Sequence, residues 1–326
     1  MRQSAVLALG LLGLLLAAGP AGAQTAPPAT PAATGDVAGL VDIGGGREMY
    51  LECRGAGGPT VVLESGYPNN ADVWDAVALD PASGKTAVLP GVAAFTSVVA
   101  YDRPGTILDF DLRSRSDLVP MPRSAIDVVT DLHMLLEIAR VPGPYVLVGH
   151  SLGGFFARLY ASIWPDEVAG LVLVDAWYEG LREALSPEDW AAYVRQGVTV
   201  PPSLVADFPD LERVNFDAVA DAMVQPARDH PLRDIPLYVI TAGLPFDVTE
   251  EDLGFSPDAW QDAWATAQDQ LASLLPDARH VIAEESGHGV HVEQPELVIE
   301  AVRQVVEAVR DPSTWATPAA SSSPAA

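Results

Sequence analysis

The sequence predicts an α/β domain with a mostly parallel central sheet, helices on both faces and a helical cap. Near-continuous apolar runs, such as residues 60–63 and 145–148, are typical of parallel strands that are buried on both faces. These runs alternate with segments of helical periodicity, as expected for strand–helix–strand units. Strand signals stop over residues 177–233, where helical fragments alternate with prolines, so a cap is expected between two strands.

Residues 1–23 have the features of a secretory signal peptide. Arg2 precedes a short apolar run over residues 5–18, and Ala21-Gly22-Ala23 before Gln24 is a small-x-small cleavage site. The run is shorter than the roughly 20 residues that a membrane span needs. We therefore expect a secreted or periplasmic protein with no stable membrane insertion after signal cleavage.

Composition places a single folded domain between two unstructured ends. Residues 24–36 predict a disordered linker and residues 313–326 a disordered tail, both rich in alanine and proline. The domain is expected over residues 37–312, with its cap at about 177–233. The formal net charge of -26 repels phosphate backbones and so argues against nucleic-acid binding. Cys53 is the single cysteine, so no internal disulfide can form, and it is predicted to be a small hydrophobe.

The individual strands follow from apolar or alternating runs that end in turn residues. The expected strands are residues 40–43, 47–54, 60–64, 97–101, 145–148, 171–174, 236–241 and 280–283. Gly44-Gly45-Gly46 joins the first two, which is a hairpin signal, so these two should add an antiparallel edge.

The helices outside the cap follow from apolar positions at helical spacing. They are expected around Trp74, from Ser124 to Ala139, from Phe155 to about Pro165, over residues 257–275, and through residues 297–309.

Gly149-His150-Ser151-Leu152-Gly153 lies between the strand at residues 145–148 and the helix that follows it. Gly-x-Ser-x-Gly at a strand-to-helix turn is the nucleophile elbow, a turn so tight that the serine hydroxyl projects clear of the sheet. Both glycines are needed because side chains there would collide where the strand and the helix pack. Ser151 is therefore the candidate nucleophile.

A serine hydroxyl needs a neighbouring base, and in domains with this elbow the residues follow in the order Ser, acid, His. His288 lies in Ser286-Gly287-His288-Gly289 after the last strand, where the flanking glycines let the loop bend its imidazole over the sheet edge. It is the candidate base, and His291 is the reserve. The excluded histidines are His133 in an earlier helix, His150 on the elbow turn (which should point it elsewhere), His230 at the end of the cap and His280 at the start of a strand.

Two aspartates are candidates for the acid that orients the imidazole and stabilises the imidazolium. Asp175 directly ends the strand after the elbow helix, whereas Asp247 lies in a longer loop after the next strand. We favour Asp175 because a strand end holds a side chain more rigidly than a long loop does. Asp247 remains the alternative.

Backbone amides at the same edge are expected to form an oxyanion hole. The first donor is the N–H of Leu152, the residue after the nucleophile, and the second should come from the loop after an earlier strand. Ser65-Gly66-Tyr67 follows such a strand, so the Tyr67 N–H is the second candidate. Asp102-Arg103-Pro104-Gly105 is interpreted as a structural turn that pins a loop beside the site.

Together these segments resemble the α/β-hydrolase superfamily, and within it the capped serine hydrolase or esterase-like group. The carriers of the resemblance are Tyr101-Asp102-Arg103-Pro104-Gly105, residues 141–154, residues 170–175, Ser286-Gly287-His288 and residues 293–298. The resemblance covers nearly the whole predicted domain. It implies the α/β-hydrolase fold, a triad of Ser151, His288 and an aspartate, no metal or cofactor, and hydrolysis through an acyl-enzyme.

Three departures from the family pattern concern the site. Ser65-Gly66 replaces the usual His-Gly before the oxyanion residue, which leaves the backbone donor intact. Thr106-Ile107-Leu108-Asp109 replaces the usual Gly-x-Ser continuation, which leaves open the shape of the loop beneath the cap. The strand ending at Thr241 lacks the compact Gly-x-x-Asp often found there, which favours Asp175.

The sequence thus predicts an exported serine hydrolase acting on carboxylic esters, with amides as a further option. Aromatic residues in the cap favour a small-molecule substrate with an apolar acyl or alcohol group, although they can equally form the core of the cap. Acyl transfer and carbon–carbon bond hydrolysis use the same triad and stay open. Ser151 argues against the aspartate-nucleophile enzymes of this fold, and a non-catalytic binding protein would be expected to lack a triad member.

Overall fold

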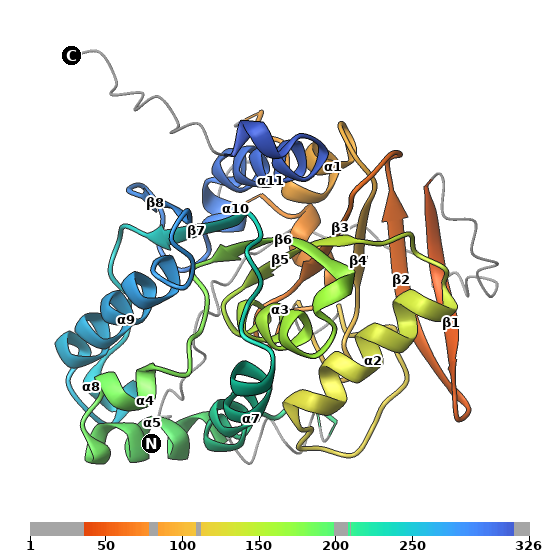
Figure 1. Ribbon diagram of the computed structural model, residues 1–326. Coiled ribbons are helices and arrows are strands. Elements are labelled where there is room, and N and C mark those ends of the chain that lie inside the picture. The colour runs from red at the N-terminus through yellow and green to blue at the C-terminus, as the bar shows by residue number, and fades with distance from the viewer. Residues whose placement is uncertain (1–35, 78–83, 109–111, 199–207, 209, 316–326) are drawn as a thin grey trace.

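The computed structural model describes residues 36–77, 84–108, 112–198, 208 and 210–315 (Figure 1). The predicted signal peptide and most of the linker lie outside these residues. The described chain continues past the predicted start of the tail, because η4 (Pro312–Thr314) and Trp315 pack onto the domain. The Trp315 ring lies 4.1 Å from the Arg279 guanidinium, and its indole N–H donates to the Asp277 carbonyl. The tail prediction therefore applies to residues 316–326, which also lie outside the described residues.

The strands of the described residues form one sheet in the order β1-β2-β4-β3-β5-β6-β7-β8. Their bounds are β1 (Val37–Gly44), β2 (Arg47–Arg54), β3 (Thr60–Glu64), β4 (Val98–Tyr101), β5 (Tyr145–His150), β6 (Val168–Val174), β7 (Leu237–Ala242) and β8 (Arg279–Ala283). β2 pairs antiparallel with both β1 and β4, and the other pairs are parallel. The predicted mostly parallel sheet with an antiparallel hairpin edge is therefore confirmed.

Helices cover both faces of the sheet, as predicted (Figure 1). Their bounds are η1 (Ala71–Asp75), α1 (Val88–Ala93), α2 (Ala125–Ile138), α3 (Leu152–Ile163), η3 (Pro165–Glu167), α8 (Glu250–Leu253), α9 (Pro257–Ala272), α10 (Val290–Glu293) and α11 (Pro295–Arg310). Alternate strand residues divide between the two layers: Leu147 packs with α2, α3 and α9, whereas Val146 and Val148 pack with α1 and α11. This alternation explains why the strands read as continuous apolar runs.

The cap lies between β6 and β7, and its described residues form helices and no strand. These helices are α4 (Leu181–Ala184), α5 (Pro187–Val198) and α7 (Phe216–Asp229). α7 packs against α2 and α3, and α4 packs against α9. Pro226, which we expected to separate helical fragments, lies inside α7. It is near the end of the helix, so its missing N–H interrupts only the last turn.

Helix α1 was not predicted, because its sequence contains both Pro90 and Gly91. Such residues disfavour a helix and interrupt the apolar periodicity that would indicate one. The glycine is explained by packing against α11, since a Cβ on Gly91 would lie 2.3 Å from the Ile299 side chain. Tertiary contact with α11 thus overrides the weak local propensity.

None of the helices in the described part of the chain is both long and apolar enough to cross a bilayer. Cys53 is half-buried beside the main core, as its alternating context in β2 predicted.

Candidate active site

Ser151 forms the turn between β5 and α3, where its φ of 51° and ψ of −126° are unfavourable for a residue with a side chain. Its amide donates to the Val174 carbonyl at 3.0 Å, and its carbonyl accepts from the Trp177 amide at 2.8 Å. The glycines are required by close contact: a Cβ on Gly153 would lie 2.3 Å from the Glu64 carbonyl oxygen. The elbow geometry expected for Ser151 is therefore present.

The loops that carry the predicted site residues leave the same edge of the sheet. β3, β5, β6, β7 and β8 run parallel, so the segments after their carboxyl ends lie side by side. After β3 the chain continues to β4 on one side, and after β5 it continues to β6 on the other, so the direction of the connections reverses between the neighbours β3 and β5. Ligand sites in open α/β sheets lie at such a reversal, and Tyr67 and Ser151 lie on its two sides.

His288 and Asp175 meet at this edge. His288 Nδ1 lies 2.6 Å from Asp175 Oδ2, and the Asp175 side chain is fully buried. Asp175 Oδ1 accepts from the Trp264 indole N–H at 3.0 Å and from the Ala242 amide at 3.1 Å. A carboxylate can only accept, so Nδ1 carries a proton, and in the neutral imidazole Nε2 is the nitrogen with the free lone pair.

The other two candidates for these positions do not form this pair. Asp247 is exposed, and the carboxylate that contacts the His288 ring is that of Asp175. His291 is buried in α10, and neither of its ring nitrogens has a hydrogen-bond partner. Of the alternatives that the sequence left open, the structure brings together Asp175 and His288.

His150 was expected to point away from the site, and this expectation is wrong. Its ring lies 4.6 Å from the His288 ring between centroids, and its Nε2–H donates to the His288 carbonyl at 2.8 Å. This hydrogen bond joins the elbow directly to the loop that carries His288. The pattern Gly-His-Ser contains no signal for this, because the side-chain direction is decided by the strained turn.

His150 and His291 form a buried, neutral pair beneath the site. Their ring centroids lie 4.1 Å apart, and Trp74 covers His291 at 4.9 Å. Burial, with smaller contributions from His291 and His288, holds the pKa of His150 well below its usual value. Burial and the neighbouring His288 lower the pKa of His291 to about 3. Both rings are therefore uncharged at neutral pH.

The two candidate oxyanion donors lie on either side of the elbow. Leu152 is the first residue of α3, so its N–H has no partner within the helix and lies at the positive end of the helix dipole. Tyr67 follows Gly66, and a Cβ on Gly66 would lie 3.1 Å from the Ser151 Cβ. Burial raises the pKa of the Tyr67 hydroxyl, whose ring packs against the main core.

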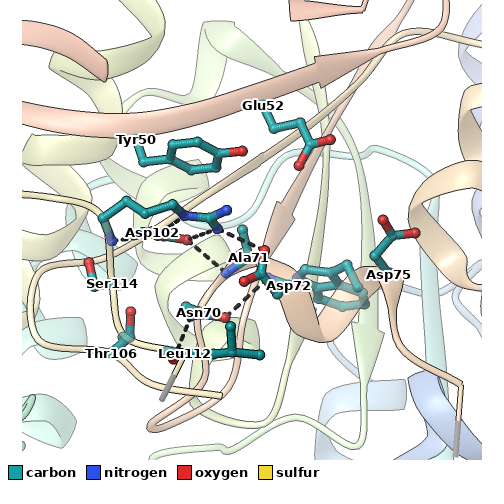
Figure 2. A network of polar contacts seen from close by, with 12 residues as sticks. Tyr50, Glu52, Asn70, Ala71, Asp72, Asp75, Asp102, Thr106, Leu112 and Ser114 are labelled. Atoms are coloured by element: carbon teal, nitrogen blue, oxygen red, sulfur yellow. Dashed lines mark hydrogen bonds and ion pairs between the residues drawn. The ribbon is translucent and has the colours of Figure 1, made fainter. Parts of the chain in front are cut away.

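The turn at Asp102-Arg103 holds the loop that carries Tyr67, as predicted from the sequence. Asp102 accepts from the Ala71 amide at 3.0 Å, and Figure 2 shows it beside Ala71 and Asp72. Arg115 donates to the same carboxylate and also pairs with Asp72. Arg103 is buried on the other side and donates to the carbonyls of Ser65 and Gly66. Both ends of the Ser65–Ala71 loop are thereby anchored.

The chain matches a known protein family and is similar to a protein of known sequence. A family model described as the alpha/beta hydrolase family matches residues 61–301. An uncharacterised protein of Bacillus subtilis (strain 168) is 24% identical over 254 residues, which are 77% of this chain and 85% of that protein.

Two solved structures show the same fold. A candidate lipase from Acinetobacter baumannii superposes with a TM-score of 0.56 at 18% identity, over 85% of this chain and 93% of that chain. A thermophilic esterase from Thermogutta terrifontis gives a TM-score of 0.51 at 19% identity, over 84% and 98%.

Proposed function

The chain belongs to the alpha/beta hydrolase family, and from this premise we propose that it is a serine hydrolase that cleaves carboxylic esters through an acyl-enzyme on Ser151. The observation that carries the proposal is the 2.6 Å contact between His288 and the buried Asp175, at the sheet edge where the Ser151 elbow stands. Amides are the second substrate class that the same chemistry would accept.

Proton transfer in this proposal follows from the tautomer of His288. Asp175 holds the proton on Nδ1, so Nε2 is the base that takes the proton of Ser151 as its oxygen attacks the carbonyl carbon. The resulting imidazolium is stabilised by the buried carboxylate and returns the proton to the leaving alcohol. Water then attacks the acyl-enzyme. Nε2 of His288 takes a proton from this water and returns it to the Ser151 oxygen as the carboxylic acid is released.

The negative charge on the carbonyl oxygen would be held by the amides of Leu152 and Tyr67. Such preorganised donors act where charge develops, and the loss of one typically costs about 10²–10³ in kcat. Support for this assignment comes from the helix start at Leu152 and from the contact of Gly66 with Ser151.

We further propose that the substrate presents an apolar acyl or alcohol group. Phe246 supports this, because its half-buried ring lies 5.0 Å from the His288 ring. The cap aromatics support it less, since Tyr193 packs on Phe216 and Trp260 and thus forms the core of the cap. Export to the periplasm or the medium is also a proposal, supported by residues 1–23, and N-terminal sequencing of the secreted protein tests it.

The decisive test combines active-site labelling with an ester panel. We expect a fluorophosphonate probe to label Ser151, identified by peptide mass spectrometry, and a Ser151→Ala variant to escape labelling. p-Nitrophenyl esters graded by acyl length should be hydrolysed by the wild type and not by this variant. An unlabelled, inactive wild type that is folded would overturn the proposal.

Asp175→Asn and Asp247→Asn form a matched pair for the acid. The first should lower kcat by about 10³–10⁴, because an amide no longer holds the required tautomer of His288. The second should stay within about threefold of the wild type, because Asp247 is exposed and the carboxylate that contacts His288 is that of Asp175. The opposite ranking would assign the acid to Asp247.

A further inference from the structure

Arg103 lies at the centre of a buried ionic network between the sheet and the cap. Its side chain is 2% exposed and pairs with two equally buried carboxylates, Glu64 and Glu212. Glu64 ends β3 and also accepts from the Tyr101 hydroxyl. Glu212 belongs to the cap, 109 residues further along the chain. A buried arginine that bridges two distant segments points to a role in holding them in register.

On the cap side, the contact is a bidentate fork. Arg103 Nε donates to Glu212 Oε1 at 2.7 Å, and Nη2 donates to Oε2 at 2.8 Å. The backbone reinforces it, since the Glu212 amide donates to the Gly105 carbonyl at 2.8 Å. A Cβ on Gly105 would lie 2.3 Å from the Asp210 carbonyl oxygen, so the cap segment lies directly on this turn. The carboxylate of Glu212 therefore sets the plane of the guanidinium.

On the sheet side, the same guanidinium holds two consecutive carbonyls. Nη1 donates to Ser65 O at 2.7 Å, and Nη2 donates to Gly66 O at 3.1 Å. The Gly66–Tyr67 peptide is trans, so its N–H points opposite to its carbonyl. Because Arg103 takes the carbonyl, the Tyr67 N–H is directed away from Arg103. A hydrogen bond at the carbonyl also polarises the peptide and strengthens its N–H as a donor.

We propose that Arg103 is a positioning residue through which Glu212 of the cap orients the Tyr67 N–H of the oxyanion hole. The inference rests on the proposed function and deepens it, because it makes the second oxyanion donor depend on a docked cap. Lysine cannot replace this arginine, since an ammonium lacks the planar fork that holds Glu212 and both carbonyls together.

The test compares Glu212→Gln and Arg103→Lys with the wild type, using the p-nitrophenyl ester that the wild type hydrolyses best. Glu179→Gln is the matched control, because Glu179 is a carboxylate at the start of the cap that forms a bidentate fork with the buried Arg158. That fork does not involve Arg103 or the Ser65–Gly66 carbonyls. The binding of a trifluoromethyl ketone, which forms a tetrahedral oxyanion on the serine, reports on the hole, and thermal unfolding shows that each variant is folded.

We expect kcat to fall about 10- to 100-fold in Glu212→Gln and Arg103→Lys, below the 10²–10³ that typically follows complete loss of a donor. The affinity for the trifluoromethyl ketone should fall in parallel, while KM stays within about threefold, because the hole acts on the transition state. Glu179→Gln should keep both kcat and this affinity.

Three results would overturn the inference. They are a rise in KM alone, unchanged kcat and ketone affinity in folded variants, or an equal loss in Glu179→Gln. If Arg103→Lys does not fold, Glu212→Gln decides by itself. A wild type that fails the labelling test refutes the proposed function, whereas an active wild type with unaffected variants refutes only this inference.

Discussion

Replacement of His291 by methionine should remove a defined part of the pH dependence of stability. The folded-state pKa of His291 is lowered from 6.5 to about 3, mainly by burial. In the unfolded chain the imidazole binds a proton below pH 6.5, but in the folded protein it stays neutral. The unfolded state thus gains protons relative to the folded state as the pH falls from 6.5 towards 3, and stability is lost in this window.

The magnitude follows from the same two values. The free energy of unfolding changes by about 1.4 kcal/mol per pH unit where one group is protonated only in the unfolded state. Between pH 7 and pH 5, where the unfolded imidazole passes from mostly neutral to almost fully charged, the loss from His291 is about 2 kcal/mol. His150 contributes with the same sign, because its pKa is also lowered. His291→Met should therefore reduce the pH dependence of the free energy of unfolding without abolishing it.

At pH 8 the variant should be at least as stable as the wild type. Both ring nitrogens of His291 are buried without a hydrogen-bond partner, and such an unsatisfied group typically costs about 1–3 kcal/mol. Methionine of similar volume removes this cost while keeping the contact with Trp74.

The assay is urea unfolding at pH 8, 7, 6 and 5, followed by tryptophan fluorescence. Val292→Met on the same short helix is the control, because it adds the same side chain without removing an ionisable group and should retain the full dependence of the wild type. The reasoning is refuted if His291→Met shows the same change between pH 7 and pH 5 as the wild type. A loss of more than about 2 kcal/mol at pH 8 would mean that the ring nitrogens are hydrogen-bonded in the folded protein.

Two further predictions concern the surroundings of the site. Trp264→Phe removes the indole donor to Asp175 Oδ1. Since a hydrogen bond to a charged group is worth about 1.5–3 kcal/mol, kcat/KM should fall about 10- to 100-fold. The control is Trp260→Phe, because the Trp260 indole N–H has no partner; its kcat/KM should stay within about threefold of the wild type, and equal losses in the two variants would contradict the role given to Trp264. Gly153→Ala should destabilise the domain by at least about 2 kcal/mol in urea unfolding, because the new Cβ would lie 2.3 Å from the Glu64 carbonyl oxygen. Gly143→Ala is the control: the nearest atom to its Cβ would be 3.5 Å away, so this variant should lose less than about 1 kcal/mol.

Local pattern was sufficient to predict the fold and the position of the Ser151 elbow. The strands could be predicted from apolar runs because both faces of a parallel sheet are buried. The elbow could be located because Gly149 and Gly153 are needed by close backbone contact, a requirement that residue type records directly. The position of His288 followed from chain order and from its place in a glycine-flanked loop after the last strand.

Tertiary structure decided what depends on side-chain direction and on contacts between distant segments. Asp175 and Asp247 both follow strands at the same edge, and only the backbone turn at Asp175, with φ of 39°, places its carboxylate against His288. The same applies to the ring of His150, which a strained turn aims at the histidine loop.

The contact of Arg103 with Glu212 lies furthest from what a sequence pattern can predict. An arginine after a strand and a glutamate in a cap have no local feature in common, and their pairing exists because the cap folds back onto the Asp102–Gly105 turn. Local propensity reports on neighbours along the chain, whereas the polarity of a buried cluster is determined by whichever segments the fold brings together. The sheet, the elbow and the histidine loop could thus be predicted from residue patterns, whereas the charges around them depend on which distant segments the fold brings together.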